Sequence, residues 1–217
     1  MKYNAIIFDL DGTLLNSLED IADATNRVLA ADGFPIHSTE EYRDFVGYGA
    51  KELIFRVLPP DYRDAETLQR CLRAYLVDYG RNWNIKTKPY PGIPEMLDLL
   101  KVHKFKLAVL SNKPEEFTQV CVRQLLSGWK FDVVLGASKN IPPKPDPAGA
   151  LEIAKRMQLT ADRYLYMGDS GVDMQTATAA HMFPVGVLWG FRGRAELLKE
   201  GAKVLLEHPE ELSKILD

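Results

Sequence analysis

The sequence predicts an α/β fold: a Rossmann-like parallel sheet with helices on both faces, plus an inserted all-helical cap domain. Three observations predict it. Short apolar runs alternate with segments of helical periodicity over residues 89–217, a pattern typical of parallel strands joined by crossover helices. Another short apolar run, at residues 5–8, opens the chain. Residues 17–88, which separate these two parts, show helical periodicity and no strand pattern.

The strands are predicted from apolar runs that are too short to form helices. Such runs are typical of strands that are buried on both faces of a sheet. The predicted strands cover residues 5–8, 107–110, 133–135, 164–167, 185–188 and 204–206. The connecting helices are predicted from the spacing of their apolar residues and from their high helix propensity. They cover residues 94–103, 114–126, 147–157, 173–180 and 194–200.

The segment between the first and second strands is far too long for an ordinary crossover connection. Three stretches within it have helical periodicity, each sufficient for one or two helices, and Gly33, Pro59 and Pro60 separate them. These stretches cover residues 21–33, 39–58 and 66–83. We therefore predict a helical cap domain of residues 17–88 and an α/β core domain of residues 1–16 and 89–217. Two adjacent linkers, near residues 14–17 and 86–92, are expected to make the cap a hinged lid.

Composition and charge exclude several classes of protein. The chain has 217 residues, 46% of them hydrophobic, which is ample for a sizeable core and a second small domain. Its net charge of −3 argues against a basic surface for nucleic acid. The sequence has no apolar stretch of membrane-spanning length and no signal peptide. We therefore expect a cytoplasmic protein with no nucleic-acid or membrane partner, and the sequence does not predict its oligomeric state.

Four aspartates follow the ends of two predicted strands: Asp9 and Asp11 after the first, and Asp169 and Asp173 after the fourth. Ligands of open α/β sheets bind at this carboxyl edge. Four carboxylates brought together there repel one another unless a cation joins them, and a hard divalent cation such as Mg2+ prefers oxygen ligands. The sequence therefore predicts a metal-assisted site with Mg2+ as its cofactor.

Each aspartate also has a simpler explanation. Asp11 and Gly12 form a common turn sequence, and Asp173 could serve only to stabilise the N-terminus of the next helix. The chemical interpretation is that one carboxylate of the Asp9 and Asp11 pair acts as nucleophile while its neighbour moves a proton. Glycines on both sides of the Asp169 turn favour the close approach of a metal or ligand.

Ser111, Asn112 and Lys144 are candidate anion-binding residues. Ser111 and Asn112 lie between an apolar strand and a helix that begins near Pro114, where a hydroxyl and free amides can bind an anion. The same residues would serve equally well as an ordinary helix cap. Lys144 lies among prolines in IPPKPDP, and its ammonium could neutralise phosphate and steady Asp9. A solvated surface charge is the alternative for Lys144.

The four segments DLDGT, SNK, the lysine before PDP, and GDSGVD occur in a fixed order that resembles the four motifs of the haloacid dehalogenase-like hydrolase superfamily. The insertion after the first motif resembles the first type of helical cap. The resemblance implies that Asp9 forms an aspartyl-phosphate and that Asp11 is the general acid/base. It implies phosphate binding by Ser111, the amide of Asn112 and Lys144. It also implies Mg2+ ligation by Asp9, the backbone carbonyl of Asp11 and Asp169, with Asp173 bound directly or through water.

The resemblance implies an Mg2+-dependent phosphatase that acts on a small phosphorylated metabolite through an aspartyl-phosphate. Segments VGYGAKEL, PYPG and GFRGRAEL resemble phosphatases of phosphoglycolate. A β-phosphoglucomutase-type mutase, a pyrophosphatase and, outside the enzymes, a phosphorylatable regulatory module are the alternatives. A capped site favours small substrates. Arg43, Lys51 and Arg192 could contact a substrate carboxylate, although a solvated surface position is the simpler explanation for each.

Overall fold

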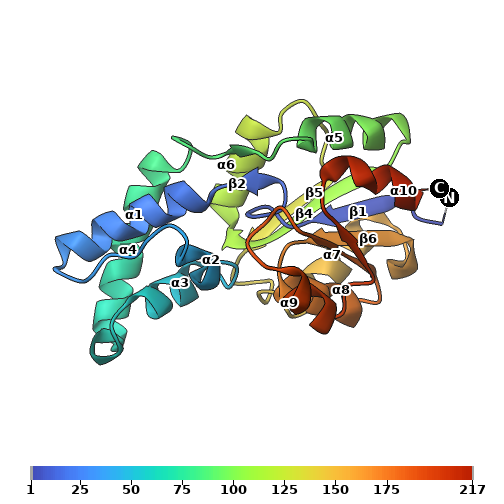
Figure 1. Cartoon of the computed structure of the whole chain (residues 1–217). Coiled ribbons are helices and arrows are strands. Elements are labelled where there is room, and N and C mark those ends of the chain that lie inside the picture. The colour runs from blue at the N-terminus through green and yellow to red at the C-terminus, as the bar shows by residue number, and fades with distance from the viewer. Residues whose placement is uncertain (1, 217) are drawn as a thin grey trace.

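The computed structural model describes residues 2–216, and its centre is one parallel sheet (Figure 1). The strand order is β5-β4-β1-β6-β7-β8. The strands are β1 (Ala5–Phe8), β4 (Lys106–Pro114), β5 (Val133–Ala137), β6 (Tyr164–Gly168), β7 (Phe183–Val187) and β8 (Val204–Leu206). The predicted α/β fold with a parallel sheet is therefore confirmed.

The central strand β1 is buried on both faces because its residues alternate between two hydrophobic clusters. Ile6 and Phe8 belong to one cluster, and Ala5 and Ile7 belong to the other. Helices cover both faces of the sheet (Figure 1). One face carries α5 (Ile93–Val102), α6 (Glu115–Leu125) and α10 (Ser213–Leu216), and the other carries α7 (Ala148–Met157), α8 (Gly171–Ala179) and α9 (Arg194–Lys199).

The remaining helices form a group at the end of the molecule opposite the chain termini (Figure 1). They are α1 (Leu18–Ala31), α2 (Tyr42–Phe45), α3 (Ala50–Val57) and α4 (Ala65–Asn82). The Asp64 side chain caps α4 by accepting hydrogen bonds from the amides of Glu66 and Thr67, both at 3.0 Å. Gly47 and Gly49 separate α2 from α3, with φ values of 102° and 90° that favour glycine.

Within residues 2–216, short 3-10 turns occur at Pro60–Tyr62, Ala161–Arg163 and Pro209–Leu212. Two further strands join the helical group to the sheet. These are β2 (Leu15–Asn16) and β3 (Lys88–Pro89), which pair antiparallel. Asp20 fixes the second of these connections, because its carboxylate accepts hydrogen bonds from the amides of Lys86 and Thr87 and from the Thr87 hydroxyl. The two connections to the helical group therefore lie side by side.

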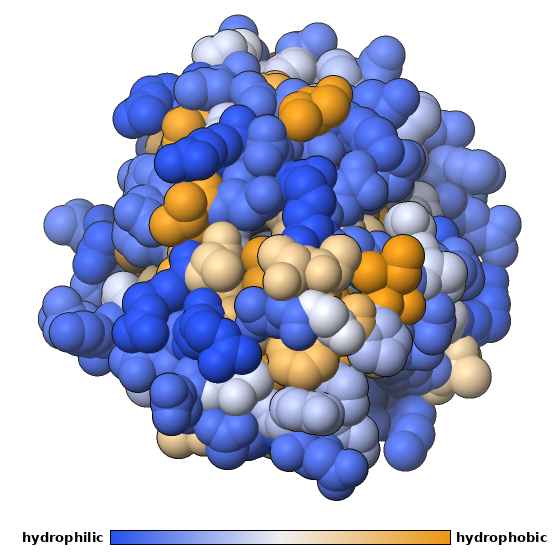
Figure 2. Space-filling model, turned by 90° about the vertical axis from the view of Figure 1, so that its left-hand side faces the viewer, coloured by the Kyte–Doolittle hydropathy of each residue, from blue (hydrophilic) through white to orange (hydrophobic). Residues whose placement is uncertain are grey.

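The surface at the helical end is largely hydrophilic, with apolar side chains in a small central area and at separate points (Figure 2). The exposed large apolar side chains of α1–α4 and their loops include Ile36, Val77 and Ile85. Of the helices that the structure describes, none has the length and apolar character required to cross a membrane.

Candidate active site

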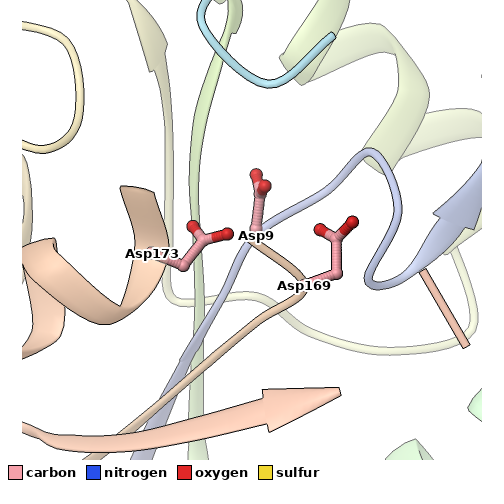
Figure 3. Close-up of side chains that lie close together, drawn as sticks. All are labelled: Asp9, Asp169 and Asp173. Carbon is pink, nitrogen blue, oxygen red and sulfur yellow. The ribbon is translucent and has the colours of Figure 1, made fainter. Parts of the chain in front are cut away.

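Three of the four predicted aspartates meet at the carboxyl edge of the sheet (Figure 3). Asp9 follows β1, Asp169 follows β6, and Asp173 lies in the first turn of α8. One carboxylate oxygen from each lies within 4.8 Å of the others, and all three side chains are buried. These residues come together because β1 and β6 are neighbouring parallel strands that end at the same edge.

Lys144 supplies part of the countercharge to this cluster. Its ammonium nitrogen lies 2.9 Å from Asp9 Oδ1 and 2.7 Å from Asp173 Oδ1. Burial disfavours the charged form of Lys144, but the Asp173 and Asp9 carboxylates outweigh it and the pKa of Lys144 is raised. The surface alternative for Lys144 is wrong, because only 5% of the residue is exposed.

Asp173 has both carboxylate oxygens engaged. Oδ1 accepts the hydrogen bond from Lys144, and Oδ2 accepts hydrogen bonds from the Ser170 hydroxyl at 2.6 Å and the Ser170 amide at 3.1 Å. The Ser170 side chain in turn caps α8, so the two residues form a capping box. The helix-cap explanation of Asp173 and its position in the acidic cluster are therefore both correct.

Asp169 has no cationic partner within the described chain. Its Oδ1 accepts a hydrogen bond from the Thr13 hydroxyl at 3.2 Å, and its Oδ2 accepts one from the Phe191 amide at 2.8 Å. Burial and the nearby Asp173 carboxylate raise the pKa of Asp169 to about 7. Burial raises the pKa of Asp9 well above its usual range as well, and Asp173 and Asp169 add to this effect while Lys144 opposes it.

This donor set fits a hard divalent cation. Asp9 and Asp169 present buried oxygen ligands, and one ammonium group does not balance three carboxylates. Glycines leave space around the Asp169 carboxylate, because a Cβ on Gly12 or on Gly190 would collide with the Asp169 side chain. Gly12 also has a φ of 87°, so a turn favoured by glycine brings its backbone close to the cluster.

Asp11 points to a different set of partners. Its Oδ1 accepts a hydrogen bond from the Ser17 hydroxyl at 2.6 Å, and its Oδ2 lies 3.0 Å from the Lys113 ammonium. The Lys113 ammonium also donates to the Tyr79 hydroxyl at 2.7 Å, and Tyr79 belongs to α4. Burial disfavours the charge on Lys113, but the Asp11 carboxylate outweighs it and the pKa of Lys113 is raised.

Sequence reasoning missed Lys113 as a functional candidate. In the sequence, Lys113 is the last residue of the SNK segment and directly follows Ser111 and Asn112. Its position at the end of a predicted strand was the available indication, but its contact with Tyr79 depends on how α4 packs. In the structure, 7% of Lys113 is exposed, so a surface position is excluded.

Ser111 and Asn112 lie in β4 beside these groups. The Ser111 hydroxyl accepts a hydrogen bond from the Lys113 amide at 3.2 Å. The Asn112 side chain donates to the backbone oxygens of Gly47 and Lys144, and it accepts from the Lys144 amide at 2.8 Å. The side chain of Asn112 therefore connects the loop that carries Lys144 with the loop between α2 and α3. Neither residue caps α6 through its side chain.

A pocket of about 50 Å³ lies between the sheet edge and the helical group. Asp9, Asp11 and Ser111 line it on the sheet side. The opposite wall is formed mainly by glycine and apolar residues, among them Gly49 and Leu53. The predicted nucleophile, acid/base and phosphate-binding hydroxyl thus all border the same small space.

Two arginines join the helical group to the loop after β7. Arg43 donates to the backbone oxygen of Gly190 at 2.9 Å, and Arg192 donates to that of Val46 at 3.1 Å. The expected surface position of Arg192 is wrong, because only 9% of this residue is exposed. Neither arginine lines the pocket, and neither does Lys51.

Comparison with known proteins gives consistent results. The protein-family model for haloacid dehalogenase-like hydrolases matches residues 6–187 of this chain. A phosphoglycolate phosphatase of Aquifex aeolicus is 32% identical over 98% of this chain and 96% of its own length. A phosphoglycolate phosphatase of Pseudomonas putida is 31% identical over 93% of this chain and 75% of its own. The crystal structure of a predicted phosphoglycolate phosphatase from Haemophilus somnus has a TM-score of 0.89 at 26% identity, covering 100% of this chain and 99% of that one.

Proposed function

The chain belongs to the haloacid dehalogenase-like hydrolase family, and on this basis we propose that it is an Mg2+-dependent phosphatase that forms an aspartyl-phosphate on Asp9. The observation that carries this proposal is the buried cluster in which Asp9, Asp169 and Asp173 share one ammonium group, that of Lys144. One ammonium group does not balance three carboxylates, and a divalent cation would supply the remaining positive charge.

In the first half of the reaction, a carboxylate oxygen of Asp9 attacks phosphorus and the bond from phosphorus to the ester oxygen breaks. Asp11 donates a proton to that leaving oxygen. Both residues border the same pocket, which supports this pairing of roles. The Asp9 amide donates to the Met167 backbone oxygen at 2.9 Å, so the nucleophile is held at a fixed place on the sheet edge.

In the second half, a water molecule attacks phosphorus and the bond to Asp9 breaks, which releases inorganic phosphate and restores the carboxylate. Asp11 accepts the proton from this water. Ser111, the backbone amide of Asn112 and Lys144 bind the non-bridging phosphate oxygens. Asp9, the Asp11 carbonyl and Asp169 would hold the cation, which would neutralise charge on the phosphoryl group. Asp173 would contact the cation directly or through water, and both of its carboxylate oxygens accept hydrogen bonds from the protein.

We also propose that residues 17–88 act as a cap on the core formed by residues 1–16 and 89–217. The two neighbouring connections of β2 and β3 support a hinge at this point. The helical group forms one wall of the pocket, so its closure would exclude bulk water from the reacting phosphate. The small pocket also favours small phosphomonoesters over protein substrates.

We propose 2-phosphoglycolate as the substrate, because the curated relatives named above are phosphoglycolate phosphatases that align with nearly all of this chain. The test is phosphate release in Mg2+ from a panel of small phosphomonoesters. Asp9→Asn should lower turnover of 2-phosphoglycolate and of an aryl phosphate by roughly 10⁴-fold or more. Full turnover by the folded Asp9→Asn variant would contradict the role of Asp9. If the wild-type protein converts a sugar phosphate to its isomer and releases no free phosphate, it is a mutase.

A further inference from the structure

Lys113 is the one cationic side chain among the described residues that line the pocket. Lys144 lies in the acidic cluster, where its ammonium contacts Asp9 and Asp173. Lys113 instead contacts Asp11 and Tyr79, on the side of the pocket that faces the helical group. The two lysines are therefore placed for different parts of a substrate.

The proposed reaction fixes which part of the substrate lies near Lys113. Asp11 must reach the leaving oxygen within hydrogen-bond distance, about 2.6–3.2 Å. The Lys113 ammonium is 3.0 Å from Asp11 Oδ2. The organic group that carries the leaving oxygen must therefore lie next to Lys113. In 2-phosphoglycolate the carboxylate carbon is only two covalent bonds from this oxygen, so its negative charge falls within reach of the ammonium.

The Lys113 ammonium makes three hydrogen bonds: to Asp11 Oδ1 at 3.1 Å, to Asp11 Oδ2 at 3.0 Å and to the Tyr79 hydroxyl at 2.7 Å. An ammonium group has three N–H donors. The Asp11 carboxylate and the Tyr79 hydroxyl are its hydrogen-bond acceptors within residues 2–216. Tyr79, which lies in α4, restricts the position of the ammonium because its hydroxyl accepts a hydrogen bond from the Lys113 nitrogen. Because two of these three acceptors are oxygens of the same Asp11 carboxylate, a substrate carboxylate can replace one of them as an acceptor of the Lys113 ammonium.

We propose that Lys113 is the specificity residue that binds a carboxylate on the carbon next to the ester oxygen, and that Tyr79 positions it. This inference rests on the proposed phosphatase function and adds the substrate class, phosphorylated 2-hydroxy acids. Arg43, Arg192 and Lys51 are not required, because none of them borders the pocket. The lysine also explains how a pocket that contains the carboxylates of Asp9 and Asp11 accepts a second substrate anion.

The experiment compares 2-phosphoglycolate with ethyl phosphate, which has a methyl group in place of the carboxylate. In the wild-type protein with Mg2+, kcat/KM should favour 2-phosphoglycolate. Lys113→Met keeps the length of the side chain and removes its charge. It should reduce this preference by roughly 10–100-fold, chiefly through a higher KM for 2-phosphoglycolate. Lys113→Arg should restore part of the preference, because it restores a cation.

Tyr79→Phe provides a milder variant if Lys113→Met does not fold. It removes only the hydroxyl that holds Lys113 and should lower the preference by about 3–10-fold. Tyr42→Phe is the matched control, since the Tyr42 hydroxyl is also buried in the helical group but donates to Asn26. The preference of Tyr42→Phe for 2-phosphoglycolate over ethyl phosphate should equal that of the wild-type protein.

The outcomes separate this inference from the proposed function. If Lys113→Met slows both substrates equally, then Lys113 acts only by supporting Asp11 and the inference is wrong. An unchanged preference in Lys113→Met would place carboxylate recognition elsewhere, for example on backbone amides near Gly49. A wild-type protein that releases phosphate from both substrates with equal kcat/KM overturns the specificity inference alone. Failure of the wild-type protein to release phosphate from either one overturns the proposed function itself.

Discussion

The ammonium nitrogen of Lys144 lies 2.9 Å from a carboxylate oxygen of Asp9, and both residues are buried. The same nitrogen contacts Asp173. A buried ion pair contributes little net stability by itself, but the removal of one partner leaves an uncompensated charge in the interior. Lys144 therefore has two separable consequences, one for folding and one for phosphate binding.

Lys144→Met should reduce the free energy of unfolding by about 3 kcal/mol and should also abolish most phosphatase activity. Urea unfolding and phosphate release measure the two effects. Lys139→Met is the control, because Lys139 is an exposed lysine in the same connection and its loss should change neither quantity appreciably. Wild-type stability in Lys144→Met would show that the two aspartates do not depend on this ammonium.

Gly190→Ala should inactivate the protein, because its Cβ would collide with the Asp169 side chain and with the Gly12 backbone oxygen. Such overpacking costs about 1–3 kcal/mol, and in a chain of this size each kcal/mol lowers Tm by about 2–4 °C. Gly193→Ala is the matched control: its φ is −91° and its Cβ would have no neighbour within 4 Å. If Gly190→Ala keeps wild-type activity and Tm, as Gly193→Ala should, the loop after β7 does not constrain Asp169.

Removal of divalent cations should make stability fall as the pH rises from about 4 to 7. The pKa of Asp169 is raised to about 7 in the folded protein, against about 3.9 in the unfolded chain. In this interval Asp169 holds a proton in the folded state that it has lost in the unfolded state, so this group alone lowers the free energy of unfolding by at most about 1.4 kcal/mol per pH unit. Urea unfolding with a chelator, and again with excess Mg2+, measures the two slopes.

Mg2+ should flatten that slope because the cation replaces the proton, and it should restore phosphatase activity to the chelated protein. Asp169→Asn, which cannot titrate at this position, should show a weaker slope even without metal. Equal slopes with and without Mg2+ would argue against cation binding by Asp169.

Arg43→Ala and Arg192→Ala should each weaken closure of the helical group over the pocket. Each removes a hydrogen bond between this group and the loop after β7. We expect kcat/KM to fall by about 3–10-fold in each variant. Arg70→Ala is the control, because Arg70 pairs with Asp32 at the surface of the helical group. Faster proteolysis near residues 86–88 in Arg43→Ala and Arg192→Ala, but not in Arg70→Ala, would support the same conclusion.

The sequence predicted the sheet and the family correctly because both depend on local patterns. Apolar runs reveal strands buried on both faces, and the motif order led to the family that the comparisons confirm. The strand predicted at residues 107–110 proved longer because β4 continues to Pro114 after a shift in its register with β5. The pairing of β2 with β3 was missed because two residues provide no periodicity.

The site was only partly predictable from sequence. Asp9, Asp169 and Asp173 could be placed at one sheet edge by topology alone, and the structure brings them together. The environment of Lys113 could not be predicted, because Tyr79 reaches it from a helix whose packing the motifs do not describe. The burial of Arg192 likewise depends on the distance between two loops. The roles of these residues in catalysis stay predictions.

The position of β1 between β4 and β6 has a consequence for biosynthesis. β1 is translated before both of its partner strands, which begin at Lys106 and Tyr164. On the ribosome it therefore remains an unpaired apolar segment while the helical insert emerges and forms its own more local contacts. We expect the insert to fold before the sheet, and β1 to be the part of the nascent chain most in need of chaperone protection.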